Sequence, residues 1–261
     1  MTLKQLLSQL QIDWKDSIID SSAGSLPQTR FDLEPRNFLI FAKEDYKEQS
    51  IRGGVNALTN AKRAIDSQLD KILLSFGFNP FEKLPRNIID YIKDNQQAVV
   101  DTSPKVQLMQ ILGIAPINFI SKIRRLRNAL EHEYKAPTPE LVLDGIELAE
   151  LFLGSTDRIF NNFPFEIVLG NEETMYDEDD RFNICVHITL NDASKIYTIE
   201  AIHQGKIIDQ ADLPPVSPIY PHLLKFILSI TISHDIQESL RNLLIRGDCI
   251  SPSEQISITL L

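Results

Sequence analysis

The sequence is poor in the residues that build metal sites and disulfide frameworks. Its 261 residues include two cysteines, Cys185 and Cys249, a number typical of a protein from the reducing cytoplasm. No residues have the spacing of a C-x-x-C or H-x-x-x-H ligand motif. His132-Glu133 begins like the zinc motif H-E-x-x-H, but Ala136 occupies the position of the second histidine. The sequence therefore predicts neither a bound metal nor a cofactor.

Long apolar runs, glycine-rich phosphate loops and a G-x-S-x-G nucleophile elbow are also missing. The longest apolar stretch, residues 223–232, is interrupted by Lys225 and Ser229 and is too short to span a bilayer. The first residues form an amphipathic pattern instead of the apolar core of a signal peptide. We therefore expect a cytoplasmic protein that does not span a membrane.

The net charge of −10 is distributed unevenly along the chain. Residues 1–165 contain 20 Lys and Arg against 21 Asp and Glu, a net charge of −1, and residues 166–261 contain 6 against 15, a net charge of −9. The acidic total argues against a non-specific coat for nucleic acid. The acidic C-terminal part would repel nucleic acid, occupy a basic partner surface, or serve as a solubilising face.

The first two thirds of the chain have the periodicity and the punctuation of helices. Apolar residues recur at spacings of three and four, which is the helical period. Pro104 and Thr138 mark helix starts, Gly77 marks a helix end, and Gly53-Gly54 marks a break or a kink. We expect helices over residues 3–14, 35–50, 55–76, 86–95, 104–114, 117–134 and 139–163. Their short, proline-bearing connections predict an antiparallel bundle.

The chain beyond residue 164 has the composition of short strands. Segments 165–169, 182–190 and 195–203 are rich in Ile, Val, Phe, Tyr and Thr, and turn residues bound them. A helical pattern over residues 235–246 follows. The predicted fold class is therefore α+β. We expect an N-terminal helix and linker over residues 1–30, in which residues 21–28 are a flexible connector, an all-α antiparallel bundle over 31–164, and a small acidic α+β domain over 165–261.

Residues 117–134 (INFISKIRRLRNALEHEY) combine two stripes on one predicted helix. An apolar stripe consists of Ile120, Ile123, Leu126, Leu130 and Tyr134. A polar stripe consists of Ser121, Arg125, Asn128 and His132. The segment is also locally basic, since Lys122, Arg124, Arg125 and Arg127 lie within six positions. These four cations are candidates for binding an anionic substrate.

The spacing R-N-x-x-x-H-x-Y, formed by Arg127, Asn128, His132 and Tyr134, resembles the signature of the HEPN superfamily of small all-helical domains. Residues 56–66 resemble the early helix of that superfamily, and the resemblance covers residues 32–163. It implies a metal-independent endoribonuclease, as a toxin or defence effector, that cleaves RNA in a cleft between two copies. The H-x-Y extension resembles the subgroup paired with a nucleotidyltransferase antitoxin, which implies that Tyr134 lies at the cleft or is nucleotidylated.

RNA cleavage needs the residue types found in this stretch. The 2′-hydroxyl next to the scissile phosphate is the nucleophile, so the protein must move protons and stabilise a charged phosphorane. His132 suits the first task because the pKa of histidine lies near neutrality. Arg127 suits the second because its guanidinium stays charged and holds two phosphate oxygens, with Asn128 beside it. Lys122, Arg124 and Arg125 would bind the RNA backbone.

The helical spacing of these residues also predicts a homodimer. Arg127 and His132 are five positions apart, or about 140° around a helix, so they do not share a face. Asn128 and His132, four positions apart, do share one. Two crossing copies of the helix would bring both arginines and both histidines into one cleft, as the resembled family does.

A non-catalytic function is the alternative. The chain would then be a HEPN-like module that binds RNA or nucleotide, or a scaffold that holds a partner through its C-terminal domain. The combination of Arg127, Asn128 and His132 favours the enzyme, and the net acidity and the extra domain favour the binding protein. Tyr134 is alternatively a core aromatic side chain. Lys62 and Arg63 either line the same cleft or are ordinary charges on a helix surface.

Overall fold

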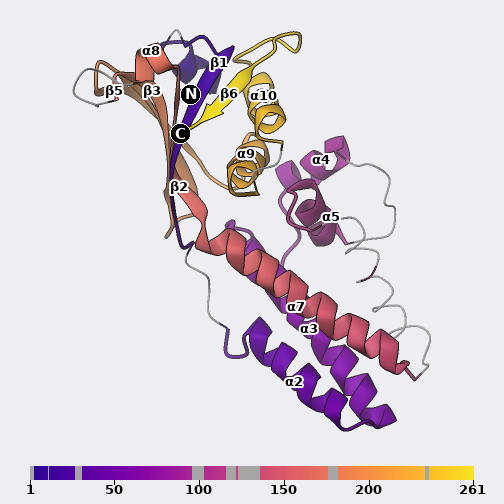
Figure 1. The fold of residues 1–261 in the computed structure, drawn as a ribbon. Helices are drawn as coiled ribbons and strands as arrows, with labels where there is room; N and C mark the ends of the chain where they lie inside the picture. Colours follow the sequence, from indigo (N-terminus) through magenta and orange to yellow (C-terminus); the bar gives the residue numbers. More distant parts are fainter. Residues whose placement is uncertain are drawn as a thin grey trace. The chain divides into compact units, whose positions relative to one another are not determined.

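A computed structural model of the chain describes residues 3–10, 12–26, 31–95, 103–115, 122, 136–175, 182–232 and 235–261. These residues belong to two compact units. The sheet unit consists of Met1–Leu26, Arg86–Ile88 and Phe160–Leu261, and the helical unit of Pro27–Pro85 and Ile89–Ile159. Figure 1 shows the elements of each unit.

Helices and strands both contribute, which confirms the predicted α+β class. The described helices are α1 (Leu3–Leu7), α2 (Pro35–Lys47), α3 (Ile51–Ser75), α4 (Arg86–Asn95), α5 (Pro104–Ile111), α7 (Pro139–Asn161), α8 (Glu172–Met175), α9 (Tyr220–Ile232) and α10 (Ile236–Arg246). The described strands are β1 (Asp16–Gly24), β2 (Phe163–Gly170), β3 (Ile184–Asn191), β4 (Ile196–His203), β5 (Lys206–Leu213) and β6 (Ser257–Leu260).

The sheet unit is organised around a six-stranded sheet with the strand order β5-β4-β3-β2-β1-β6. Strands β2 to β5 follow one another in the sheet as they do along the chain, and each pair is antiparallel. Strand β1 is antiparallel to β2 and parallel to β6. The N-terminal and C-terminal strands therefore pair with each other at one side of the sheet.

The two faces of the sheet have different side chains. The inner face is apolar and at most 3% exposed, with Ile167, Leu169, Val186, Ile188, Tyr197, Ile199 and Ala201. Helix α9 packs against it, and the rings of Tyr220 and Tyr197 lie 5.7 Å apart. We call the opposite side, on which His187 projects, the outer face. Strand β4 shows much of the alternation that is expected of an antiparallel sheet with one solvated face. On the outer face, Val168, Cys185 and Ile202 are nevertheless buried.

The N-terminal segment differs from the prediction. Residues 1–30 were expected to be a helix and a flexible linker, but α1 ends at Leu7 and residues 16–24 form strand β1. Ile19 is only 1% exposed and pairs with Leu169 of β2 and Leu260 of β6. The serine- and glycine-containing sequence around residues 21–24 misled the prediction, because its strand conformation comes from ladder hydrogen bonds with distant segments.

Three long helices, α2, α3 and α7, pack together in the helical unit. Helices α2 and α3 are antiparallel. The Asn60 side chain, in the first half of α3, donates a hydrogen bond to the Asp45 carboxylate near the end of α2. Helix α7 contacts both of them through side chains. Leu58, Ile65 and Ile72 of α3 are at most 1% exposed and form part of the core. The antiparallel bundle predicted for residues 31–164 includes segments outside the described ranges and stays a prediction.

Several local signals in the sequence are confirmed. Pro104 is the first residue of α5, with Ser103 as the N-cap. The Thr138 hydroxyl accepts a hydrogen bond of 3.3 Å from the Leu141 N–H at the start of α7. After α3, Gly77 has a φ of 80°, a left-handed conformation that favours glycine and ends the helix.

The break predicted at Gly53-Gly54 is wrong, because α3 begins at Ile51 and runs through both glycines. The Ser50 hydroxyl caps this start by accepting the Gly53 N–H at 2.9 Å. A Cβ atom at Gly53 would lie 2.5 Å from the Asp45 carbonyl oxygen. At Gly54 it would make an ordinary contact of 3.6 Å with Val142. Gly53 therefore serves the close approach of α2 to α3.

We expect Gly53→Ala to lower the free energy of unfolding by about 1–3 kcal/mol, because the added methyl group collides with backbone that must shift. Gly54→Ala is the matched control. It should leave stability unchanged or raise it by up to about 1 kcal/mol, since alanine has the higher helix propensity. Urea unfolding followed by circular dichroism measures both, and equal effects of the two substitutions would contradict the assigned close approach.

Candidate functional site

The residues predicted to form the active site fall almost entirely outside the described part of the chain. Arg124, Arg125, Arg127, Asn128, His132 and Tyr134 all lie between residues 123 and 135. Lys122 is described: it is helical and exposed. Whether the side chains of this predicted site meet therefore remains a prediction. The described residues on either side belong to α5, which ends at Ile111, and α7, which begins at Pro139.

The segment that resembles the early helix of the HEPN superfamily lies within α3. Its apolar side chains face the core, and Ala57, Leu58, Ala61 and Ala64 are fully buried. Lys62 forms an ion pair of 3.1 Å with Asp66 one turn later, and Arg63 is exposed. The described structure thus places Lys62 and Arg63 on the solvent side of α3. It does not show them lining a cleft.

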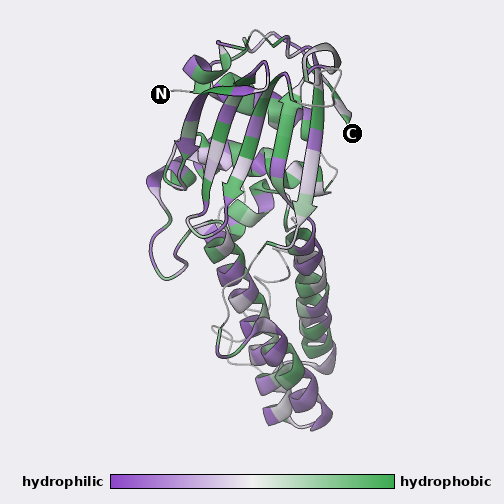
Figure 2. Ribbon diagram, turned by 90° about the vertical axis from the view of Figure 1, so that its left-hand side faces the viewer, coloured by the Kyte–Doolittle hydropathy of each residue, from purple (hydrophilic) through white to green (hydrophobic). Residues whose placement is uncertain are grey.

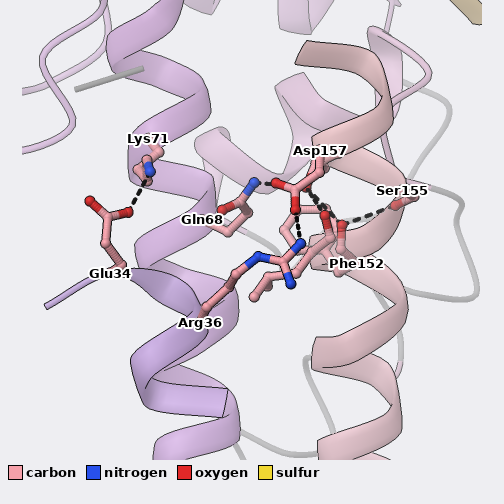
Figure 3. A network of polar contacts seen from close by, with 9 residues as sticks. Glu34, Arg36, Gln68, Lys71, Phe152, Ser155 and Asp157 are labelled. Atoms are coloured by element: carbon pink, nitrogen blue, oxygen red, sulfur yellow. Dashed lines mark hydrogen bonds and ion pairs between the residues drawn. The ribbon is translucent and has the colours of Figure 1, made fainter. Parts of the chain in front are cut away.

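Polar side chains link α2, α3 and α7 (Figure 3). The carboxylate of Glu34, immediately before α2, accepts a hydrogen bond from the Lys71 ammonium of α3. It accepts a second hydrogen bond, of 2.8 Å, from the Phe31 N–H. Arg36 of α2 forms an ion pair with Asp157 of α7. Since only 8% of Lys71 is exposed, its ammonium requires this carboxylate partner. These pairs fix the positions of the three helices relative to one another.

A buried hydrogen bond lies beside these ion pairs. The Gln68 amide donates to the Thr156 hydroxyl at 2.8 Å, and both side chains are at most 2% exposed. Thr156 in turn donates to the Phe152 carbonyl oxygen at 2.8 Å. The chain of bonds satisfies polar groups that would otherwise destabilise the core. We assign it a structural role.

Ion pairing also neutralises further cations of the helical unit. Lys43 pairs with Glu150 at 2.9 Å, and Lys105 pairs with Asp70 at 2.9 Å. A phosphate approaching either lysine would have to displace a carboxylate. The basic cluster of Lys122, Arg124, Arg125 and Arg127 is in a different sequence context, because Glu131 and Glu133 are its nearest acidic residues along the chain.

On the outer face of the sheet, His187 lies between two glutamates of neighbouring strands. Its Nε2 atom is 2.7 Å from Glu166 Oε1 on β2, and its Nδ1 atom is 3.2 Å from Glu200 Oε2 on β4. The Phe182 ring packs beside the imidazole, with 5.9 Å between ring centroids. The sequence gives no spacing that marks His187, because the two glutamates meet it only through strand register.

This arrangement does not form a metal site. The two carboxylates approach opposite nitrogens of the ring, so the three side chains do not converge on one point. No group of three or more His, Cys, Asp or Glu suited to a metal ion occurs among the residues that the structure describes. The arrangement can hold a proton on either nitrogen and fixes the ring on the sheet.

The sheet unit also contains a cavity of about 240 Å³. Leu7, Ile12 and Trp14 form apolar parts of its wall, and Lys4, Asp248 and Cys249 contribute polar atoms. Burial, together with the Asp248 carboxylate, raises the pKa of the Cys249 thiol to about 11, although Lys4 opposes the shift. A protonated thiol is a poor nucleophile. The cavity therefore offers space for a small molecule but no activated nucleophile.

Comparison of the chain with protein-family models, with curated proteins and with solved structures finds no match. Within the described ranges, none of the helices has the length and apolarity needed to cross a bilayer. A function must therefore be argued from the residues themselves.

We expect both cysteines of the folded protein to react with iodoacetamide at about pH 8 at least about tenfold more slowly than in the urea-unfolded chain. Burial raises the pKa of Cys185 to about 12 and contributes most to the raised pKa of Cys249. Only the thiolate reacts, and both thiols are free. Mass spectrometry of the alkylated peptides measures each rate, and equal rates in the two states would contradict the assignment.

The same shifts determine the sign of a pH effect on stability. The folded chain holds both thiol protons more tightly than the unfolded chain, whose cysteines have a pKa of 9.0. This contribution to stability is complete below pH 9 and is lost as the pH rises toward 11 and 12.

Proposed function

We propose that the chain is a metal-independent endoribonuclease of HEPN type, acting in the cytoplasm as a toxin or defence effector. The spacing of Arg127, Asn128 and His132 on one predicted helix is the observation that carries the proposal. The proposed substrate is RNA, and the proposed active form is a homodimer. An antitoxin or another regulatory protein is the proposed partner.

The described helices support the fold that this function requires. An antiparallel bundle over residues 31–164 needs helices before and after the signature segment, and α3, α5 and α7 occupy such positions along the chain. The α3 segment of the resemblance has a buried apolar side and a charged outer side, as a bundle helix has. Lys122 is helical and exposed, in agreement with a helix over residues 117–134.

In the proposed mechanism the 2′-oxygen of the RNA attacks the adjacent phosphorus, and the bond to the 5′-oxygen of the next nucleotide breaks. His132 moves the protons of these two oxygens, and Arg127 stabilises the extra negative charge of the phosphorane. Asn128, on the same helical face as His132, hydrogen-bonds the substrate. Lys122, Arg124 and Arg125 bind neighbouring phosphates. The products are a 2′,3′-cyclic phosphate and a 5′-hydroxyl end.

Tyr134 is two residues after His132 in the sequence, and the proposal gives its phenol a regulatory role. It lies at the rim of the cleft, where a nucleotidyltransferase partner would modify it and block access to RNA. Adding a nucleotide there introduces negative charge beside the phosphate site, which repels the substrate.

We expect His132→Ala to lower the rate of RNA cleavage by about 10²-fold or more, the scale of losing a general acid or base. Arg127→Ala should lower it at least as much, because it removes the charge that stabilises the phosphorane. Cleavage of a labelled RNA in EDTA measures both effects, and the cyclic phosphate product identifies the chemistry.

His203→Ala and Arg52→Ala provide matched controls, since they remove the same side-chain types from β4 and from the exposed start of α3. Both should cleave RNA at the wild-type rate. Thermal melting confirms that each variant is folded. The proposed mechanism would be contradicted if the wild type required Mg²⁺ for activity, or if His132→Ala or Arg127→Ala left the activity unchanged.

We expect the active enzyme to be a dimer whose site combines two copies. Mixing Arg127→Ala protein with His132→Ala protein should restore activity to at most about a quarter of wild type, because random pairing makes half the dimers mixed and each restores one of two sites. Light scattering at the assay concentration gives the oligomeric state. An active monomer would overturn the composite site.

A second candidate function is a non-catalytic HEPN-like module that binds RNA or nucleotide, or that scaffolds a partner through the sheet unit. The net charge of −10 and the sheet unit, which the predicted nuclease site does not use, favour this function. An inactive wild-type protein that still binds RNA would support this candidate and not the nuclease.

A further inference from the structure

The cavity of about 240 Å³ in the sheet unit is built from two stretches of chain, residues 4–14 and residues 248–254. The first stretch contains most of α1 and precedes β1, and the second follows α10 and precedes β6. Strands β1 and β6 are parallel neighbours, and the Ser257 hydroxyl donates to the Lys15 carbonyl oxygen at 3.0 Å. The pairing of these two strands therefore brings the two walls of the cavity together.

One part of the wall is apolar. Its residues are each at most 9% exposed: Leu7, Ile12, Trp14 and Ile250. Charged residues line the same space, and Figure 2 shows hydrophilic and hydrophobic residues interspersed in the same way over the sheet unit. A small cavity with apolar walls and a few polar groups is the usual form of a site for a small molecule.

Trp14 has a polar group that no described residue uses. The side chain is 8% exposed and lines the cavity. Among the residues that the structure describes, none accepts a hydrogen bond from its indole N–H, and none stacks on its ring. A buried tryptophan N–H usually has a hydrogen-bond partner. The acceptor for this N–H therefore belongs to a molecule in the cavity.

The charged residues of the wall are mostly acidic. They are three carboxylates and one ammonium: Asp13, Asp248, Glu254 and Lys4. Asp248 and Lys4 are exposed and form no ion pair with a residue in the described ranges. Both act on the Cys249 thiol beside them, whose pKa the Asp248 carboxylate raises more than the Lys4 ammonium lowers it. Negative charge therefore dominates at this part of the wall.

The other two carboxylates are held in place by backbone groups. One oxygen of Asp13 accepts the Lys15 N–H at 3.0 Å, and one oxygen of Glu254 accepts the Ser251 N–H at 2.7 Å. Arg241 of α10 does not line the cavity, and its guanidinium donates to the carbonyl oxygens of Glu254 and Pro252. These hydrogen bonds orient two of the three acids without neutralising their charge.

We infer that this cavity binds a small organic cation, a protonated amine attached to an aromatic body. The carboxylates of the wall attract the ammonium group and bond it, with Asp248 as its main partner. The aromatic body packs against Leu7, Ile12 and Trp14, and its ring face or an attached oxygen accepts the indole N–H. An anionic molecule of the same size meets three carboxylates against one lysine and is repelled.

Tryptophan fluorescence tests this inference directly, because Trp14 is the single tryptophan of the chain. Three probes share a phenyl ring and differ in charge at about pH 7: 2-phenylethylamine, 2-phenylethanol and 3-phenylpropionate. We expect the amine to change the fluorescence in a saturable way and to bind at least about tenfold more tightly than the alcohol. The carboxylate should bind more weakly than the alcohol. Calorimetry with the same probes checks each dissociation constant.

Two substitutions in the wall should act in opposite directions. Asp248→Asn removes one negative charge, and asparagine tolerates the left-handed φ of 57° at this position. It should weaken binding of 2-phenylethylamine by about tenfold and change binding of 2-phenylethanol by less than about twofold. Lys4→Gln removes the only ammonium of the described wall and should strengthen amine binding by about two- to fivefold. A variant that merely loosened the fold would weaken all three probes together.

Asp144→Asn is the matched control, since it makes the same chemical change at an exposed position of α7. It should change amine affinity by less than about twofold. The inference would be overturned by a fluorescence signal that none of the probes changes, by equal affinities for the amine and the carboxylate, or by equal weakening in the control. Unchanged amine binding in Asp248→Asn, or weaker binding in Lys4→Gln, would also contradict it. Circular dichroism confirms that each variant is folded, and Lys4→Gln still decides the question if Asp248→Asn is not.

Discussion

The pairing of strand β1 with β2 and β6 is the constraint on which the organisation of this chain depends. It joins residues near the N-terminus to two segments more than a hundred positions away. Ile18 and Ile19 are buried on opposite sides of the sheet, so β1 contributes to the packing of both faces. The residues of the helical unit are thereby inserted between two strands that are neighbours in the sheet, with Arg86–Ile88 of the same stretch belonging to the sheet unit.

Charge divides the protein in a second way. In the helical unit, Lys43, Lys71 and Lys105 are paired with carboxylates of neighbouring elements. On the outer face of the sheet, Glu166 and Glu200 both contact the His187 ring. Residues 166–261, which form most of the sheet unit, carry a net charge of −9, whereas residues 1–165 carry a net charge of −1.

Sequence reasoning located the helices well, because their signals are local. Pro104, Thr138 and Gly77 act within one turn of their own position, and each occupies its expected place. The strands were found where β-branched and aromatic residues are dense. Strand β1 and strand β6 were missed, since their serine-containing sequences take strand conformation only through partners far along the chain.

The same distinction applies to the candidate sites. The spacing of Arg127, Asn128 and His132 is visible in the sequence because one helix holds all three. The contacts of His187 with Glu166 and Glu200 depend on the register of three strands, which no local pattern reveals. The wrong prediction of a helix break at Gly53-Gly54 has a related cause. A glycine that is required where two helices approach closely looks the same in the sequence as a glycine that ends a helix.

The insertion of the helical unit also has an architectural consequence. The Leu26 N–H donates to the Phe160 carbonyl oxygen at 2.8 Å, so the chain leaves the sheet unit and returns to it at almost the same point. The register of β1 with β2 is consequently independent of how many residues lie between them. Residues 86–88 within the inserted segment nevertheless belong to the sheet unit, and the Asn87 amide donates to the Pro215 and Ser217 carbonyl oxygens at 2.9 and 2.8 Å. Replacing or excising the segment would therefore also remove a contact that the sheet unit uses.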